Sequence, residues 1–321
     1  MHLPRLLVTR AMPKNVSNRA MRDYTALFNP DDTVLSADEI VARAHAHQAE
    51  AMLICSSDRI SADLVARLPD GLRVIATFSV GHEHIDVAAC KARGIVAANT
   101  PDVLTEATAD TAMLLLLAAM RRAYEGDRLV RAGEWVGWHT TMLLGRDPRG
   151  KRLGIYGMGR IGQAVAQRAR AFGMQIHYHN RRRLPPGQEQ GAAYHDSLGG
   201  LLRVCDALSI NAPSTPETRG LFNAETLALL PEGAYFVNTA RGDMVDDEAL
   251  IAALKSGHIR AAGLDVFAGE PKLHPGYAAL PNVFLLPHLG SATEETRDAM
   301  GFAALDNIDA VLQGRTPPSP L

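Results

Sequence analysis

The sequence has few cysteines and no excess of either charge. Its three cysteines, Cys55, Cys90 and Cys205, are odd in number and lie far from any Cys-x-x-Cys or Cys/His pattern, which argues against a disulfide framework or structural zinc. We therefore expect reduced, buried thiols. Lys and Arg total 33 against 35 for Asp and Glu. A protein that neutralises nucleic-acid phosphates normally has a basic excess, so no nucleic-acid partner is predicted.

The chain also lacks a long hydrophobic run. The longest, Ala112 to Met120, has nine residues, whereas a helix that spans a bilayer takes about 20, so this run predicts a buried helix and no membrane segment. Met1 to Arg5 show no charged leader before an apolar stretch, and we expect a cytoplasmic protein. The 321 residues, 47% of them hydrophobic, predict two globular domains, because a domain typically has about 100 to 200 residues.

Short apolar runs alternate with helix-length amphipathic segments along the whole chain. This alternation is typical of parallel sheets covered by helices, so the fold class is α/β with two doubly wound domains. The first hundred residues predict strands at Leu6 to Thr9, Ala51 to Cys55, Arg73 to Phe78 and Ile95 to Ala98, and helices at Val16 to Ala26, Ala37 to His47 and Ser61 to Arg67.

A second series of strands follows a long helical pattern that runs from Val103 to Tyr124. Its predicted strands are Leu153 to Tyr156, Gln175 to His179, Ala207 to Ile210, Ala234 to Asn238, Ala261 to Asp265 and Val283 to Leu286. A last helix is predicted at about Glu294 to Leu312, before a Pro-rich tail, and these residues alone do not decide which domain it covers.

A glycine-rich turn joins the first strand of the second series to a helical stripe. The turn reads Gly157-x-Gly159-x-x-Gly162, which permits a tight bend and close backbone approach, and the helix N-terminus offers unpaired N–H groups to a pyrophosphate. The order strand, glycine turn, helix predicts a dinucleotide site. The alternative is an ordinary βα turn.

The end of the next strand decides which dinucleotide is expected. An NAD site places an acidic residue about 20 positions after the glycine turn, but this chain has His179, Asn180 and then Arg181, Arg182 and Arg183. Guanidinium groups bind phosphate in bidentate fashion. The sequence therefore predicts NADP, with NAD used at lower efficiency; the alternative is that the arginines form a solvated loop.

Polar residues directly after strands are the first catalytic candidates, because ligands bind beyond the carboxyl ends of parallel strands. Arg241, Glu270 and His288 follow three successive strands. Together they suit the reduction of a 2-oxo acid: Arg241 can bind the carboxylate and polarise the carbonyl, His288 can protonate the alkoxide, and Glu270 can orient His288 and favour its cation. Individually they have other interpretations: a helix cap, a solvated loop residue and a buried imidazole.

The chain resembles the D-isomer-specific 2-hydroxyacid dehydrogenase family, and within it the glyoxylate/hydroxypyruvate reductases. The resemblance covers nearly the whole chain. It is carried by the motifs Ser79-Val80-Gly81, Asn99 to Thr105, Gly157 to Gly162, Thr239-Ala240-Arg241-Gly242, Asp265 to Pro271 and Pro287 to Ser291.

This resemblance implies roles for individual residues. Arg241, Glu270 and His288 would be catalytic, and the N–H groups of Val80 and Gly81 would bind the substrate carboxylate beside Arg241 and His288. The expected cofactor contacts come from the glycine turn, the segment after its second strand and several strand ends: Thr108, Gly157, Met158, Gly159, Arg160, Ile161, Gly162, Asn180, Arg181, Arg182, Ala212, Pro213, Thr239, Ala240, Asp265 and Gly290.

The resemblance also implies the domain organisation. A flavodoxin-like substrate domain would comprise residues 1–100 and be completed by 292–321, and a Rossmann cofactor domain would comprise residues 101–291. The active site would lie in the cleft between them, and the protein would form a homodimer through the cofactor domain. For the substrate side-chain pocket, the loops offer Leu53, Trp138 and Met142 as candidates.

One histidine-rich pattern could suggest a metal site. His82, His84 and Asp86 have a His-x-His-x-Asp spacing, but they adjoin the expected carboxylate-binding loop and the family needs no metal, so no metal is predicted.

Three other functions are alternatives to a 2-hydroxyacid dehydrogenase. A formate-dehydrogenase-like enzyme would not need the acid-base pair of Glu270 and His288. A long-form phosphoglycerate dehydrogenase would need a further regulatory domain. A non-catalytic, NAD(P)-sensing binding protein is the rival from another class.

Overall fold

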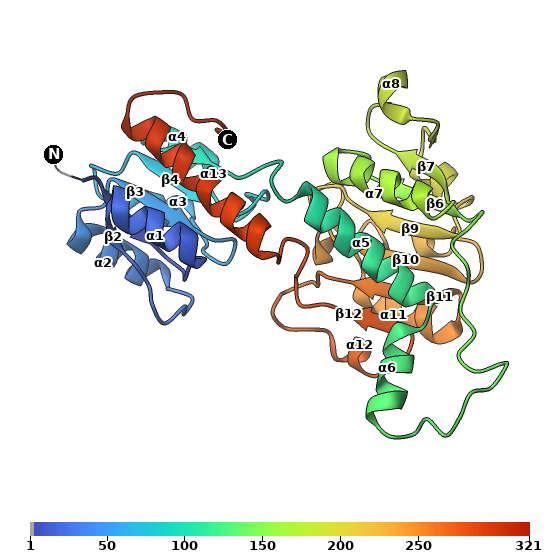
Figure 1. The fold of residues 1–321 in the computed structure, drawn as a ribbon. Coiled ribbons are helices and arrows are strands. Elements are labelled where there is room, and N and C mark those ends of the chain that lie inside the picture. The colour runs from blue at the N-terminus through green and yellow to red at the C-terminus, as the bar shows by residue number, and fades with distance from the viewer. Residues whose placement is uncertain (1–2) are drawn as a thin grey trace. The chain divides into compact units, whose positions relative to one another are not determined.

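The computed structural model describes residues 3–321, which divide into two compact units (Figure 1). One unit comprises the residues up to Leu104 together with Ala292–Leu321, and the other comprises Thr105–Ser291. The sequence placed the divisions near residues 100 and 291. The assignment of substrate to the first unit and cofactor to the second stays a prediction.

The first unit is built on a five-stranded parallel sheet with the order β2-β1-β3-β4-β5, the flavodoxin-like arrangement. Leu6 and Val8 point to one face of this sheet and pack against the first and last helices, while Leu7 points to the other face. The strands are β1 (Arg5–Val8), β2 (Thr25–Leu27), β3 (Ala51–Ile54), β4 (Val74–Thr77) and β5 (Val96–Ala98), and the helices are α1 (Lys14–Asp23), α2 (Ala37–His47), α3 (Ala62–Ala66), α4 (Val87–Ala92) and α13 (Glu294–Leu312).

The last helix and the tail belong to this first unit. Ala304, Leu305 and Ile308 of α13 are fully buried against the sheet. The tail then pairs with the edge strand β5, where Ala98 and Pro320 form an antiparallel bridge and Leu321 N–H donates to Ala97 O at 2.9 Å. The chain's end therefore closes the edge of the sheet next to β5.

The second unit has a seven-stranded parallel sheet with the order β12-β11-β10-β9-β6-β7-β8. This is the doubly wound Rossmann arrangement, in which the strand order reverses between β6 and β9. Its strands are β6 (Arg152–Tyr156), β7 (Gln175–His179), β8 (Ala193–Tyr194), β9 (Ala207–Ile210), β10 (Ala234–Asn238), β11 (Ile259–Leu264) and β12 (Val283–Leu285). Its helices are α5 (Thr105–Met120), α6 (Ala123–Arg131), α7 (Arg160–Ala171), α8 (Pro186–Glu189), α9 (Leu198–Leu202), α10 (Ala224–Leu227), α11 (Asp247–Ser256) and α12 (Pro275–Ala278), with a 3-10 turn at Gly242–Met244.

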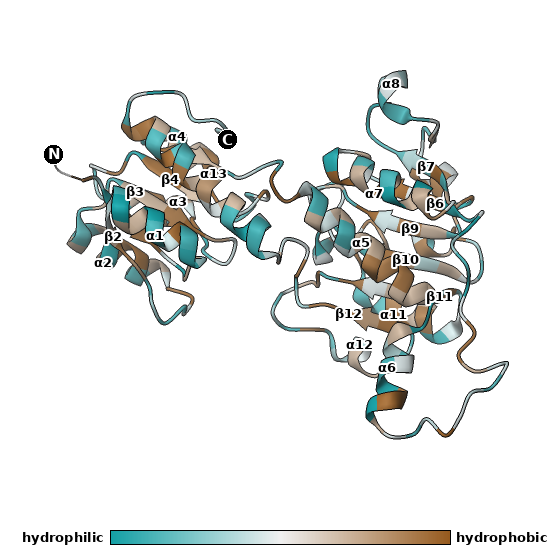
Figure 2. Cartoon of the chain, in the orientation of Figure 1, coloured by the Kyte–Doolittle hydropathy of each residue, from teal (hydrophilic) through white to brown (hydrophobic). Residues whose placement is uncertain are grey.

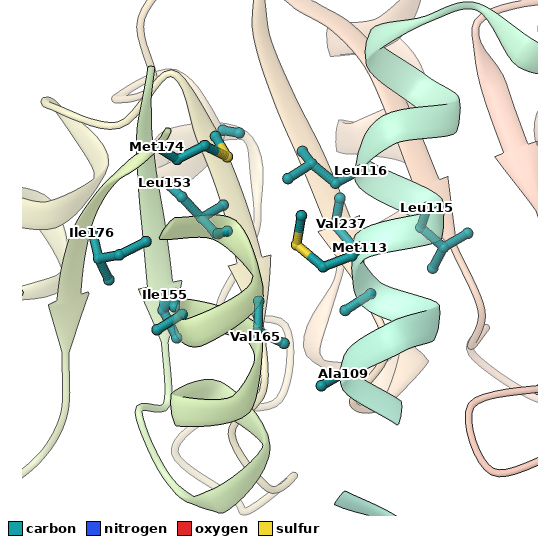
Figure 3. Close-up of a cluster of buried hydrophobic side chains, with 14 of the residues drawn as sticks. Ala109, Met113, Leu115, Leu116, Leu153, Ile155, Val165, Met174, Ile176 and Val237 are labelled. Atoms are coloured by element: carbon teal, nitrogen blue, oxygen red, sulfur yellow. The ribbon is translucent and has the colours of Figure 1, made fainter. Parts of the chain in front are cut away.

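Apolar side chains of α5 and α7 pack against one face of this second sheet. Figure 3 shows Met113 and Leu116 of α5 facing Leu153 and Ile155 of β6, with Val165 of α7 beside them. Figure 2 shows the same division of polarity in both units, with apolar strands inside and polar helix surfaces outside. No helix within residues 3–321 combines the length and apolar character needed to cross a bilayer.

The structure corrects two predicted helices of the sequence analysis. The helix predicted from Val16 to Ala26 ends at Asp23, and the short edge strand β2 follows it. The helix predicted from Val103 to Tyr124 is two helices, α5 and α6, because Arg122 adopts a left-handed backbone conformation with φ +55°. Cys90 and Cys205 are buried free thiols and Cys55 is partly buried, with burial raising the pKa of the Cys55 thiol to about 12.

Candidate active site

The predicted glycine turn lies where the strand order of the second sheet reverses. Gly157 directly follows β6 with φ +93°, and a Cβ at this position would lie 2.6 Å from the amide nitrogen of Ala212, which follows β9. Only glycine fits this combination of positive φ and close approach. The turn therefore brings together two predicted cofactor segments, Gly157 to Gly162 and Ala212 with Pro213.

The residues around this turn fit a bound dinucleotide. Gly159 begins α7 without a side-chain cap, and a Cβ there would meet no atom within 4 Å, so Arg160 and Ile161 start the helix beside open space. At the neighbouring strand ends, Oγ1 of Thr239 and Oδ1 of Asn211 are buried and have no hydrogen-bond partner among residues 3–321. Open space at a helix N-terminus and orphaned polar atoms are what a polar cofactor would fill.

Asn180 holds the glycine turn from the end of β7. Its side-chain Oδ1 accepts a hydrogen bond from the backbone N–H of Met158 at 2.6 Å. The position that would carry a carboxylate in an NAD site thus carries a neutral amide that is already bound to the turn.

The three arginines after Asn180 differ in their surroundings. Arg183 is bound in bidentate fashion to Glu189, with Nε to Oε1 at 2.8 Å and Nη2 to Oε2 at 3.0 Å. This ion pair, together with the hydrogen bond from the Tyr178 hydroxyl, lowers the pKa of Glu189 to about 2. Arg181 and Arg182 are exposed and form no hydrogen bond or ion pair within the described chain. Arg181 lies close enough to Tyr156 to oppose the rise that burial causes in the pKa of Tyr156. Two of the three guanidinium groups are therefore available to a ligand.

Arg241 is positioned by a tight turn after β10. Asn238, which is 1% exposed, accepts a hydrogen bond from Ala240 N–H at 2.9 Å and donates one to Arg241 O at 2.9 Å. The Arg241 guanidinium donates to Ala240 O at 2.7 Å. The alternative that Arg241 caps the following helix is wrong, because the side chain of Asp246 caps α11.

The loop that carries Arg241 touches the loop that carries Glu270. A Cβ at Gly242 would lie 1.9 Å from the carbonyl carbon of Phe267 and 2.3 Å from Ala268 N. No other residue than glycine allows this backbone contact. The close approach puts the Arg241 charge near Glu270, where it helps to lower the pKa of that carboxyl.

Glu270 and His288 form the expected pair. Nδ1 of His288 lies 2.7 Å from Oε2 of Glu270, and the two side chains are 48% and 34% exposed. Burial alone would raise the pKa of Glu270, but the His288 hydrogen bond and the positive charges of His288 and Arg241 outweigh it and lower the pKa. Glu270 is thus a carboxylate at neutral pH, and its bond to Nδ1 leaves Nε2 of the imidazole free to face a substrate.

The backbone of His288 is held in an uncommon conformation. His288 has φ +56°, in the left-handed region that non-glycine residues rarely adopt outside turns and functional sites. Its N–H donates to Asp265 O at 2.9 Å. The buried Asp265 carboxylate accepts from Leu289 N–H at 2.6 Å and Gly290 N–H at 2.8 Å, while burial raises its pKa. Asp265 therefore fixes the turn that presents His288.

Thr108, Asp265 and Gly290 lie together, as their shared assignment to the cofactor site requires. A Cβ at Gly290 would lie 3.2 Å from Oδ2 of Asp265 and 3.5 Å from Cγ2 of Thr108. The three come from α5, the end of β11 and the segment after β12, so the sheet and its first helix converge here.

Val80 and Gly81 belong to the first unit, in the loop after β4. Both are partly exposed at the carboxyl end of the sheet. Within the neighbouring His-x-His-x-Asp pattern, His84 Nε2 lies 2.9 Å from Thr77 Oγ1, and Asp86 caps α4 through Ala89 N–H. These two side chains therefore serve the local fold.

The three candidates for the substrate side-chain pocket have different surroundings. Leu53 lies in the middle of the first sheet and is fully buried among side chains of β1 and α13. The prediction that Leu53 lines a substrate pocket is therefore wrong. Trp138 is 75% exposed and Met142 is partly buried, both in the segment between α6 and β6.

Sequence reasoning missed Asn238 and Asn211 as site residues. Asn238 ends β10 beside Thr239, and Asn211 follows β9 beside Ala212, so a side-chain amide at a strand end is the signal that could have found them.

The comparisons with known proteins identify the family. Residues 113–290 match the family model for the NAD-binding domain of D-isomer-specific 2-hydroxyacid dehydrogenases. The chain is 45% identical over 312 residues to glycerate dehydrogenase of Hyphomicrobium methylovorum, covering 97% of this chain and 96% of the relative. It is 41% identical over 320 residues to glyoxylate reductase of Thermococcus kodakarensis, covering 98% and 95%.

A solved structure shows the same fold with ligands bound. The NADPH-dependent glyoxylate/hydroxypyruvate reductase of Sinorhizobium meliloti, in complex with NADP and malonate, superposes with a TM-score of 0.89 at 34% identity, covering 99% of this chain and 96% of that one. By its relatives and its fold, the protein is an oxidoreductase with an NAD(P)-binding domain. It belongs to the D-isomer-specific 2-hydroxyacid dehydrogenase family.

Proposed function

We propose that the protein reduces a small 2-oxo acid, such as glyoxylate or hydroxypyruvate, to the D-2-hydroxy acid with NADPH. The observation that carries this proposal is the pairing of His288 with Glu270 at 2.7 Å, beside the charge of Arg241 and next to a turn that fits a dinucleotide. The relatives named for glyoxylate reduction and glycerate oxidation catalyse chemistry of this class.

Each of the three residues has a distinct task in this reaction. NADPH bound at the glycine turn would supply the hydride. Arg241 binds the substrate carboxylate and polarises the carbonyl with a planar fork that can engage both oxygens. His288 gives a proton from Nε2 to the oxygen that becomes the hydroxyl, and the Glu270 carboxylate orients the ring and stabilises the imidazolium before that transfer.

The preference for NADPH rests on Asn180, Arg181 and Arg182. A 2'-phosphate brings up to two negative charges, and each charge-assisted hydrogen bond from arginine contributes roughly 1.5 to 3 kcal/mol before screening on an exposed loop. Asn180 carries no charge that would repel the phosphate. The related Sinorhizobium meliloti reductase is described as NADPH-dependent and was solved with NADP.

A reduction screen tests substrate class and cofactor together. Glyoxylate, hydroxypyruvate, 2-ketogluconate and phenylpyruvate are offered with NADPH and NADH in parallel. We expect kcat/KM to favour NADPH on the order of 10² to 10³, mostly through KM, because the phosphate lies far from the transferred hydride.

A double variant and a control test which residues cause the preference for NADPH. Asn180→Asp combined with Arg181→Ala should lose NADPH and gain NADH, since a carboxylate pairs with the ribose 2'-hydroxyl and repels a phosphate. Arg183→Ala is the control, because the guanidinium of Arg183 is held by Glu189. Equal use of NADH by the wild-type protein at physiological salt would overturn the cofactor assignment.

We also propose that the protein is a homodimer formed through the second unit. Trp135, Val136 and Trp138 lie within four residues of one another after α6 and are 54%, 92% and 75% exposed. Clustered exposed apolar residues of this kind favour a protein interface. Light scattering should give twice the 34.6 kDa chain mass, and Val136→Asp should give the single mass; a wild-type monomer would contradict the proposal.

A further inference from the structure

The loop after β4 contains three successive peptide carbonyls that are all bound. Ser79 O accepts from Thr100 N–H at 2.9 Å, Val80 O accepts from the Asn99 side-chain amide at 2.8 Å, and Gly81 O accepts from the Ser79 hydroxyl at 2.7 Å. Three separate donors therefore fix the three peptide planes between Ser79 and His82.

The N–H groups of the same peptides have no partner. In a trans peptide the carbonyl and the following N–H point in opposite directions, so the three bound carbonyls orient the N–H groups of Val80, Gly81 and His82. None of these N–H groups donates a hydrogen bond to any residue in 3–321. Val80 and Gly81 are partly exposed and His82 is exposed, at the carboxyl end of the sheet.

The Ser79 hydroxyl is in turn held by a chain of donors. Ser79 has one hydroxyl proton, which goes to Gly81 O, so the contact of 2.8 Å between Ser79 Oγ and Thr77 Oγ1 must use the Thr77 proton. Thr77 Oγ1 then accepts from His84 Nε2 at 2.9 Å. Thr77 is fully buried, which anchors this chain in the sheet.

Asn99 is held from the other side by α13 and the segment that follows it. Its backbone O accepts from the side chain of Asn307 at 3.1 Å, and its backbone N–H donates to Ser319 O at 3.2 Å. Asn307 is 1% exposed and also accepts from Ser319 N–H at 2.8 Å. Because these contacts use only the backbone of Asn99, its side-chain amide can be removed without breaking them.

We propose that Asn99 and Ser79 are positioning residues that aim the N–H groups of Val80, Gly81 and His82 at the carboxylate of the substrate. The inference rests on the proposed function for the nature of the ligand. It adds His82 N–H as a third donor and assigns the orientation of all three to the carbonyl contacts.

The test uses Asn99→Ala and Ser79→Ala in the full-length protein with NADPH bound. KM for glyoxylate should rise about tenfold in each variant while kcat changes little, because each substitution frees one peptide plane that binds the carboxylate. Calorimetry should show the same loss of affinity for oxamate, a carboxylate analogue, and an unchanged affinity for NADPH.

Ser36→Ala is the matched control. Ser36 caps α2 through Glu39 N–H, so this variant should lose stability without changing KM or oxamate affinity. If Asn99→Ala and Ser79→Ala keep wild-type KM and oxamate affinity, or change no more than Ser36→Ala, the inference is overturned.

Failure of the proposed function has a different signature. If the wild-type protein reduces no 2-oxo acid, the proposed reductase function is overturned. The positioning role of Asn99 and Ser79 is then tested by oxamate binding alone. Binding by the wild type that both variants weaken supports the positioning role. No binding by the wild type overturns it.

Discussion

At the scale of residues, the proposed chemistry depends on the hydrogen bond between Glu270 and His288. Glu270 would have a raised pKa if burial acted alone, and the contact with His288 together with the Arg241 charge reverses that effect. The pKa of Glu270 is therefore lower than that of an ordinary glutamate, so protonation of this carboxylate does not set the upper pH limit of reduction.

Glu270→Gln tests this division of labour. The substitution removes the anionic partner of His288, so the decline of reductive kcat/KM at high pH should move to lower pH. Oxidation of the D-2-hydroxy acid needs the neutral imidazole and should show the opposite dependence. Both are measured as pH–rate profiles.

Glu248→Gln is the matched control for that profile. Oε1 of Glu248 lies 3.0 Å from Nε2 of His274 in a similar pair, and neither residue is one of the three candidates. The control should leave the profile in place. A profile that Glu270→Gln also leaves in place would remove Glu270 from its assigned role.

At the scale of elements, the site depends on loops that meet at the carboxyl ends of β10, β11 and β12. Gly242 is the contact point between the first two, where a Cβ would lie 1.9 Å from Phe267. Asp265 joins the second to the third through Leu289 and Gly290. Arg241, Glu270 and His288 are thus fixed relative to one another by backbone contacts.

Gly242→Ala should damage both stability and catalysis. The added methyl group must push the Arg241 loop away from the Glu270 loop, so we expect a loss of about 1 to 3 kcal/mol in the free energy of unfolding and a lower kcat. Gly187→Ala is the control in the same unit, because a Cβ at Gly187 meets no atom within 4 Å. Denaturant titration and steady-state kinetics measure the two effects, and equal behaviour of the two variants would contradict the account.

Hydrophobic pattern predicted the elements best where they are buried. β7, β9, β10, α2 and α13 lie at the predicted bounds. β9 and β10 are runs of buried residues, β7 alternates between buried and more exposed positions, and Ser36 and Thr293 cap the two helices. The pattern missed β2, a three-residue edge strand with no fully buried side chain, and the left-handed break at Arg122 between α5 and α6. Neither feature changes the periodicity of the sequence.

The site shows the same limit. Strand-end position was enough to nominate Arg241, Glu270 and His288, because parallel strands bring such residues to one edge. The carbonyl contacts of Asn99 and Ser79, the pairing of Arg183 with Glu189 and the approach of Gly242 to Phe267 join segments whose separation in the sequence carries no signal. Only the folded structure reveals them.

At the scale of the whole molecule, the two units divide the work that the account assigns to the protein. The second unit contains the three candidate catalytic residues and the glycine turn, and the first contains the loop whose three N–H groups we propose as the carboxylate site. A hydride transfer between a cofactor and a 2-oxo acid needs both sets of groups.

We assign to His288 the proton that NADPH-dependent reduction requires. Oxidation of NADPH in the presence of glyoxylate, measured for wild type, His288→Ala and His274→Ala, tests this role. His274, which also pairs with a glutamate, is the control. The account predicts turnover by the wild type and by His274→Ala, and a kcat lower by roughly 10² to 10⁴ in His288→Ala with an unchanged affinity for NADPH. Near-normal turnover by His288→Ala would contradict the assignment, and a wild-type protein that binds NADPH without turnover on any 2-oxo acid would favour a nucleotide-sensing protein instead.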